Sequence, residues 1–117
     1  MDATTGCRRM RLEEGLAAVP GPGGDRFAPV DRRRTREVAV RAPPGPDPQQ
    51  RHSRDEVYVV VRGSGRVACD DSREPFGPGD FLFVPDCAER RFEDFTPDLS
   101  VWGLLIGPEG GERPAGT

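Results

Sequence analysis

Four side chains that could carry out chemistry lie in two short segments of this 117-residue chain: His52, Glu56 and Tyr58 in the first, and Arg90 in the second. His52 is the only histidine. An imidazole or a carboxylate can exchange a proton with a bound molecule, and a guanidinium can hold an anionic or enolate oxygen. These four residues are therefore candidate catalytic residues for a proton-transfer reaction.

The spacing of these residues places them on one face if their segments are β-strands. Side chains of an extended segment alternate between two sides, so positions of equal parity share a side. The even-numbered positions then face one interior, namely Gln50, His52, Glu56, Tyr58, Val60, Arg90 and Phe92. A few polar groups within apolar walls are the usual composition of a small-molecule site.

Short β-rich runs separated by clumps of Gly and Pro predict an all-β domain. A short helix is expected at 12–19, ended by Pro20. Residues 66–69 are expected to return after the turn at 63–65 as the hairpin partner of a strand at 57–62. The other expected strands lie at 25–32, 35–41, 81–84, 89–95 and 100–106, and 70–73 is expected to be a turn. About eight short strands with one helix favour an antiparallel sandwich or barrel.

Length and composition predict one barrel domain at 12–108, with a flexible lead-in at 1–11 and a flexible tail at 109–117. The 20 acidic residues outnumber the 17 basic ones, and the net charge is −3. A nucleic-acid partner is therefore not expected. No apolar run approaches the length of a membrane span, so no membrane partner is expected either.

The cysteines Cys7, Cys69 and Cys87 are odd in number and lack C-x-x-C spacing. They predict neither a disulfide framework nor a cysteine-type zinc site. The N-terminus lacks the apolar segment of a signal peptide, so a reduced, cytoplasmic location is expected. The chain has no Lys and no Asn but much Arg, Gly, Pro and Ala, which indicates a GC-rich bacterial genome.

Two motifs give the chain a family resemblance. The first motif consists of His, His, Glu and Gly at fixed spacing, and the matching positions here are Gln50, His52, Glu56 and Gly63, with Gln in place of the first His. The matching positions of the second motif are Gly79, Pro85, Cys87, Arg90 and Asp94. Over roughly residues 35–108 this order resembles the cupin family. The resemblance implies a single-domain cupin-like antiparallel β-barrel of jelly-roll type, which in small members of the family is commonly a homodimer.

The same resemblance implies a metal site of which only part is present. Gln50, His52 and Glu56 would be a weak ligand set for Fe, Mn, Ni or Zn, completed by water or substrate. Arg90 stands where the second motif has its His, and a guanidinium has no lone pair to donate. We therefore favour no metal cofactor and expect the Arg90 guanidinium to fork onto the Glu56 carboxylate in the space a metal would take.

The apolar walls of the pocket are expected to include Val60, Phe81, Phe83, Phe92 and Trp102, although the aromatic residues could equally fill the core. Three functions stay open. The first is a small-molecule barrel without a redox metal, for which the family resemblance implies an isomerase or a cyclase. The second is a metal-dependent, dioxygenase-like oxidoreductase using His52 and Glu56. The third is a non-catalytic binding or structural module that dimerises through an edge strand.

Overall fold

The computed structural model of the chain describes residues 6–20, 26–33, 36–42, 50–52 and 54–111. Within them it has one helix and nine strands. The bounds are α1 (Leu12–Ala17), β1 (Phe27–Arg32), β2 (Arg36–Arg41), β3 (Gln50–His52), β4 (Asp55–Arg62), β5 (Gly65–Cys69), β6 (Ser72–Phe76), β7 (Phe81–Val84), β8 (Cys87–Glu93) and β9 (Ser100–Ile106).

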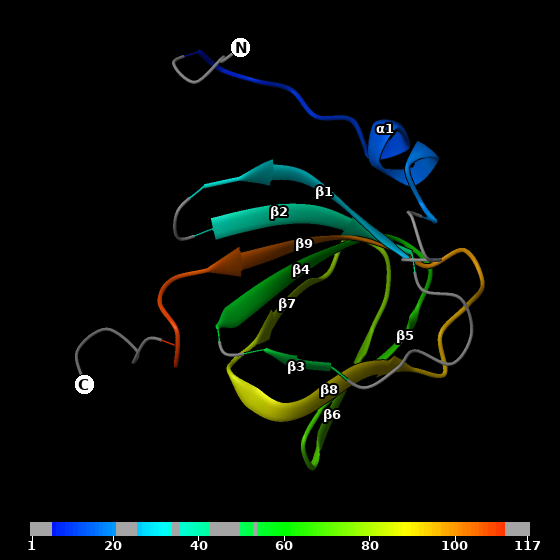
Figure 1. Cartoon of the computed structure of the whole chain (residues 1–117). Coiled ribbons are helices and arrows are strands. Elements are labelled where there is room, and N and C mark those ends of the chain that lie inside the picture. The colour runs from blue at the N-terminus through cyan, green and yellow to red at the C-terminus, as the bar shows by residue number, and fades with distance from the viewer. Residues whose placement is uncertain (1–5, 21–25, 34–35, 43–49, 53, 112–117) are drawn as a thin grey trace.

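The strands form two antiparallel sheets that face each other (Figure 1). The five-stranded sheet has the order β1-β2-β9-β4-β7, and the four-stranded sheet has the order β3-β8-β5-β6. The predicted all-β class with one short helix is therefore confirmed. The flexibility predicted for 1–11 and 109–117 stays a prediction, since 1–5 and 112–117 lie outside the described residues. Residues 43–49, before β3, also lie outside them.

Apolar side chains from the inner faces of both sheets meet in one core. Val60 and Val101 contribute from the five-stranded sheet, and Val67 and Phe92 from the four-stranded sheet; all four are at least nine-tenths buried. The Phe92 ring lies at the centre, with its centroid 4.9 Å from that of Tyr58. This core holds the two sheets together and fixes β4 opposite β8.

One predicted strand pairing is wrong. Residues 66–69 do not return along 57–62, because β5 pairs with β6 and β8 whereas β4 pairs with β7 and β9. The segment at 63–65 instead carries the chain from one sheet to the other. Gly63 has φ 90° and a Cβ there would lie 2.7 Å from the Leu99 Cα, so both its conformation and its surroundings require glycine. A turn signal shows where a strand ends, not which sheet the next strand joins.

A second difference is that two strands, β3 and β6, are additional to the expected ones. The turn expected at 70–73 is shorter, because Ser72 already begins β6. Most of β6 is exposed, and only its last residue, Phe76, is buried. Its sequence therefore lacks the apolar alternation by which the other strands are recognised.

The helix α1 packs on the outer side of the five-stranded sheet. It contacts β1 and β2, and a Cβ on its Gly15 would overlap the side chain of Val40. Glu13 of the same helix accepts a hydrogen bond from Arg62 of β4 at 2.8 Å. The helix therefore covers one part of this outer face and leaves the rest uncovered by any described element.

The cysteines differ from expectation. Cys69 is disulfide-bonded, whereas Cys7 is free and exposed. This bond was not predicted from the number and spacing of the cysteines. A disulfide requires two cysteines that are close in space, and the sequence does not show which strands lie side by side. None of the helices among the described residues is long and apolar enough to cross a membrane.

Candidate functional site

A buried carboxylate lies at the centre of the candidate site. The Glu56 side chain on β4 is 2% exposed, and Arg90 on β8 is 3% exposed. The Arg90 Nη2 donates to Glu56 Oε1, so the predicted ion pair is present. Because β4 and β8 belong to different sheets, this pair joins the two sheets across the barrel interior.

The Tyr58 hydroxyl completes the environment of the same oxygen. It donates a hydrogen bond to Glu56 Oε1 at 2.8 Å. The Arg90 guanidinium carbon also lies 5.8 Å from the Tyr58 ring centroid, within reach of a cation–π interaction. Tyr58 thus touches both members of the ion pair, and all three side chains are almost fully enclosed.

Arg41 is a site residue that the motifs did not reveal. Its Nε lies 3.5 Å from Glu56 Oε2, so the second carboxylate oxygen also faces a guanidinium. Arg41 lies on β2, two strands away from β4 in the sheet order. The sequence does show that Arg41 shares one face of a predicted strand with Glu37 and Ala39, because all three are odd-numbered. Which of the two faces points into the barrel becomes clear only from the pairing of the strands.

Gly103 on β9 is the second residue that sequence reasoning missed. It pairs with both Ala39 and Tyr58, so it lies between Arg41 and the carboxylate in the sheet. A Cβ at Gly103 would lie 2.9 Å from Glu56 Oε2 and 3.5 Å from Arg41 Nε. The missing side chain is what allows Arg41 to reach across β9 to Glu56.

The predicted convergence of even-numbered positions holds wherever the side chains are described. Glu56, Tyr58, Val60, Arg90 and Phe92 are all buried, and Tyr58, Val60 and Phe92 belong to the core cluster. The apolar members of this group fill the interior beside the ion pair.

Gln50 and His52 are placed by their backbones alone. In β3, Gln50 pairs with Arg90 and His52 pairs with Cys87, with a register shift between the two. Their side chains lie outside the part that the structure describes. The shift means that regular alternation cannot be assumed between them, so their catalytic and metal-binding roles stay predictions.

Three of the expected lining residues point away from the interior. Val84 and Leu82 of β7 pack in or against the core, so the alternate residues Phe81 and Phe83 face outward and are 68% and 56% exposed. Trp102 likewise lies between the inward-facing residues Val101 and Gly103 and so belongs to the outer face. These strands are apolar on both faces, which is why parity alone did not identify the inner one.

The described residues do not fit a transition-metal site. Among the side chains that the structure describes, no group of three His, Cys, Asp or Glu residues lies close enough to hold a metal. Both oxygens of Glu56 already face guanidinium groups. A metal cation would have to displace these contacts and lie beside two permanent positive charges, which is electrostatically unfavourable.

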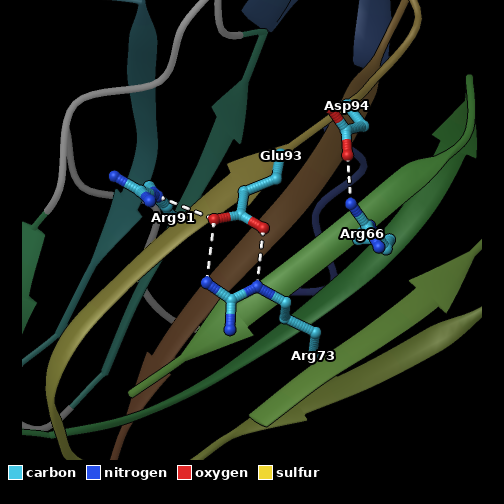
Figure 2. Close-up of polar contacts among 5 residues, drawn as sticks. All are labelled: Arg66, Arg73, Arg91, Glu93 and Asp94. Carbon is cyan, nitrogen blue, oxygen red and sulfur yellow. Dashed lines mark hydrogen bonds and ion pairs between the residues drawn. The ribbon is translucent and has the colours of Figure 1, made fainter. Parts of the chain in front are cut away.

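Charged residues also gather on the outer face of the four-stranded sheet (Figure 2). Arg73 and Arg91 both donate to the Glu93 carboxylate, each through Nε at 3.0 Å, and Arg66 pairs with Asp94. The hydrogen bond from Arg73, followed by that from Arg91, lowers the pKa of Glu93. These contacts form a solvated ion-pair network, separate from the buried site.

Comparison with known proteins now identifies the class. The model of the family described as "Cupin domain" matches residues 38–97, which is just over half of the chain, and the chain belongs to this family. No match was found among curated proteins.

Several solved structures share the fold. Protein NMB1881 from Neisseria meningitidis is 19% identical, with a TM-score of 0.65, over 86% of this chain and 100% of its own. A Ralstonia eutropha protein provisionally named a mannose-6-phosphate isomerase is 25% identical, with a TM-score of 0.61, over 87% of this chain and 100% of its own. KdgF from Halomonas sp. is 19% identical, with a TM-score of 0.59, over 71% of this chain and 78% of its own.

Proposed function

We propose that this cupin binds a small molecule inside its barrel and acts on it by proton transfer, as an isomerase or a cyclase does. The observation that carries the proposal is the buried Glu56 carboxylate with its contacts to Arg90, Tyr58 and Arg41. Burying such charges costs desolvation free energy that apolar residues would not incur. A charged cluster inside a small barrel is therefore better explained by function than by stability.

The charges of the site favour a substrate with an anionic oxygen. The guanidinium groups of Arg41 and Arg90 suit a carboxylate or the enolate oxygen that forms when a proton leaves the carbon beside a carbonyl. The base that takes the proton is His52 or Glu56, and the same group returns the proton to a different atom of the substrate. The Tyr58 hydroxyl donates to Glu56 Oε1 at 2.8 Å and so orients that carboxylate for the transfer.

The family relatives support this class of reaction in part. The Ralstonia eutropha protein carries the name of an isomerase, and an isomerase moves a proton without net oxidation. The dioxygenase-like alternative would need a metal held by His52 and Glu56, and the arginine contacts of Glu56 weigh against it. A bacterial cytoplasmic location stays a prediction, and the disulfide at Cys69 weighs against a reduced compartment.

The test is exchange of substrate protons for deuterium. The full chain is incubated in heavy water with a panel of 2-oxo acids, aldehydes and sugar phosphates, and the loss of proton signal is followed by NMR. Arg41→Gln removes a guanidinium from the interior and should slow exchange at least about tenfold, on the order of 1.4 kcal/mol in activation free energy. Arg73→Gln removes one from the outer face of the other sheet and should leave exchange unchanged.

Two results would overturn the proposal. One is the absence of exchange with every compound of the panel. The other is a stoichiometric content of iron, manganese, nickel or zinc in protein expressed in supplemented medium, with activity that depends on it. The back-substitution Arg90→His serves as a positive control for metal analysis, since it restores an imidazole to the second motif.

A further inference from the structure

The candidate site is enclosed by the protein. Glu56 and Arg90 are 2% and 3% exposed, and Tyr58 is 4% exposed. A molecule the size of a metabolite does not pass through such an enclosure, so part of the protein has to move before a substrate reaches Glu56. Access to the site therefore requires a segment that opens.

One end of the barrel is filled by the core. The strand β4 runs from Glu56 toward Val60, which is 1% exposed and belongs to the same core cluster as Leu99 and Val101. The crossover between the sheets closes this end further, since a Cβ on Gly63 would lie 2.7 Å from the Leu99 Cα. The opposite end of the barrel, where β4 begins, is therefore the nearer way to Glu56.

At this opposite end the chain continues from β9 as the segment 107–111. In the register of the sheet, Ile106 pairs with Asp55, the residue before Glu56, so the segment begins directly beyond the buried carboxylate. Figure 1 shows it in red, passing along the end of the barrel where β4 begins. Its middle is exposed and its two end residues are partly buried. A segment held at both ends with a solvated middle has the form of a lid.

The far end of this segment rests on a buried carboxylate. Asp55 is 7% exposed, and a Cβ on Gly111 would lie 2.7 Å from Asp55 Oδ1. The same oxygen accepts a hydrogen bond from the backbone N–H of Asp86 at 3.1 Å. Asp86 lies in the turn between β7 and β8. Asp55 is thus the point at which this turn and the end of the segment meet.

The near end of the segment is suited to be a hinge. Gly107 follows β9 and has φ 78°, and glycine passes between positive and negative φ at little cost. A hydrogen bond from the Gly111 N–H to the Pro108 carbonyl at 3.1 Å keeps the residues beyond the hinge together as a turn. Among the described residues no strand follows this turn. Rotation about Gly107 therefore breaks no strand pairing in that part of the chain.

We infer that residues 107–111 form a lid over the substrate entrance, hinged at Gly107 and latched where Gly111 rests on Asp55. Release of the latch lets the lid turn away and admits a substrate to the buried site. Closure of the lid then excludes water from the reacting groups. The inference rests on the proposed function, because it describes how the same buried site is reached.

Tyr58 allows the opening to be measured without a substrate. It is the only tyrosine of the chain, and it lies 4% exposed inside the site. Its nitration by tetranitromethane, measured by mass spectrometry, follows the entry of a small reagent. The full chain is used with Cys7→Ser, because the reagent would also oxidise the exposed thiol. Urea below the unfolding transition should change the nitration rate little, since a local opening exposes little surface.

Two further variants in this background test the latch. Gly111→Ala and Gly110→Ala both place alanine at a positive φ, 77° and 84°, so they share the backbone strain. Only the Cβ at position 111 meets Asp55, whereas the one at 110 has nothing within 4 Å. Gly111→Ala should therefore nitrate about tenfold faster than Gly110→Ala, because the overlap with Asp55 displaces the lid.

A nitration rate that rises with urea in step with global unfolding would rule out the lid, since Tyr58 would then be reached only by unfolding. That measurement needs no lid variant to fold. Equal rates in Gly111→Ala and Gly110→Ala would also rule it out, because Asp55 would not be the latch. Circular dichroism establishes that each variant is folded. Nitration needs no substrate, so a lid that opens in a chain without deuterium exchange would count against the proposed reaction alone.

Discussion

The adjacent residues Arg90 and Arg91 lie on opposite faces of β8 and have different roles. Arg90 is 3% exposed and contacts the Glu56 carboxylate inside the barrel. Arg91 points the other way and pairs with Glu93 on the outer face. The first contact removes two charges from water, whereas the second leaves them solvated. Substitutions at these neighbours should therefore have very different effects on stability.

Replacing Arg90 with Met should destabilise the fold by about 3–5 kcal/mol, since the Glu56 carboxylate would lose a buried cationic partner. Glu56→Gln in the same chain should recover about 1–3 kcal/mol of that loss, because no uncompensated carboxylate remains. Urea unfolding of the two single variants and the double variant measures the coupling. Free energies that simply add would show that the two side chains do not interact in solution.

Gly103 should not tolerate even a methyl group. The added Cβ would lie 2.9 Å from Glu56 Oε2, so Gly103→Ala should cost about 1–3 kcal/mol through displacement of the carboxylate and Arg41. Gly77→Ala is the matched control, because a Cβ there meets nothing within 4 Å. Thermal unfolding compares the two variants. Equal melting temperatures would mean that the site adjusts freely around Gly103.

The residues at this scale were only partly predictable. The pairing of Glu56 with Arg90 followed from motif spacing, which fixes which strand positions face each other in a known fold. Arg41 and Gly103 belong to no motif, and their importance comes from a diagonal contact across β9. A one-dimensional pattern does not contain that contact, because it depends on which strands are neighbours.

At the scale of the strands, the outer face of the four-stranded sheet is held by ion pairs between neighbours. Glu93 on β8 bonds to Arg73 on β6 and to Arg91 two residues earlier on β8 (Figure 2). These bonds lower the pKa of Glu93. The ionised carboxylate therefore favours the folded state above the pKa that Glu93 has in the unfolded chain. This contribution is lost as the pH falls through the lower pKa of the folded state.

We expect an NMR titration to give Glu93 a pKa below the ordinary value for glutamate. Arg73→Gln should raise this pKa more than Arg91→Gln, because the hydrogen bond from Arg73 is the larger cause of the shift. Arg62→Gln removes an arginine that pairs with Glu13 instead and should leave the titration of Glu93 unchanged. An ordinary pKa for Glu93 in the wild-type chain would contradict the network.

The strands themselves could be located from the sequence more readily than their partners. The last strand, β9, has the bounds predicted from its apolar run, and the hairpin of β1 and β2 follows from period-two alternation. The sheet to which β5 belongs was predicted wrongly, because the turn at 63–65 looks the same whether the chain reverses or crosses over. Alternation likewise could not assign Phe81 and Phe83 to the outer face, since β7 is apolar throughout.

At the scale of the whole molecule, the two sheets divide the surface into a charged side and an apolar side. The buried ion pair and the core join them from within. If two copies associate through the apolar side, where Phe81 and Phe83 are exposed, folding and association are linked. The stability of the chain then depends on its concentration, because only the folded state dimerises.

The melting temperature of the wild-type chain should rise by a few degrees between about 5 and 500 μM, which corresponds to on the order of 1–2 kcal/mol of added stability. The variant with Phe81→Glu and Phe83→Glu should melt at one temperature throughout. Differential scanning calorimetry at several concentrations makes the comparison. A melting temperature that does not change with protein concentration in either chain would show that folding is not coupled to association.

The exposed thiol of Cys7 and the disulfide at Cys69 together make the chain able to react with itself. In alkaline buffer the Cys7 thiolate of one molecule can attack a disulfide sulfur of another, forming a mixed disulfide and releasing a new thiolate that continues the exchange. Covalent oligomers produced in this way would imitate genuine association on a sizing column. Cys7→Ser removes the initiating nucleophile. The oligomeric state should therefore be measured on a chain that carries this substitution.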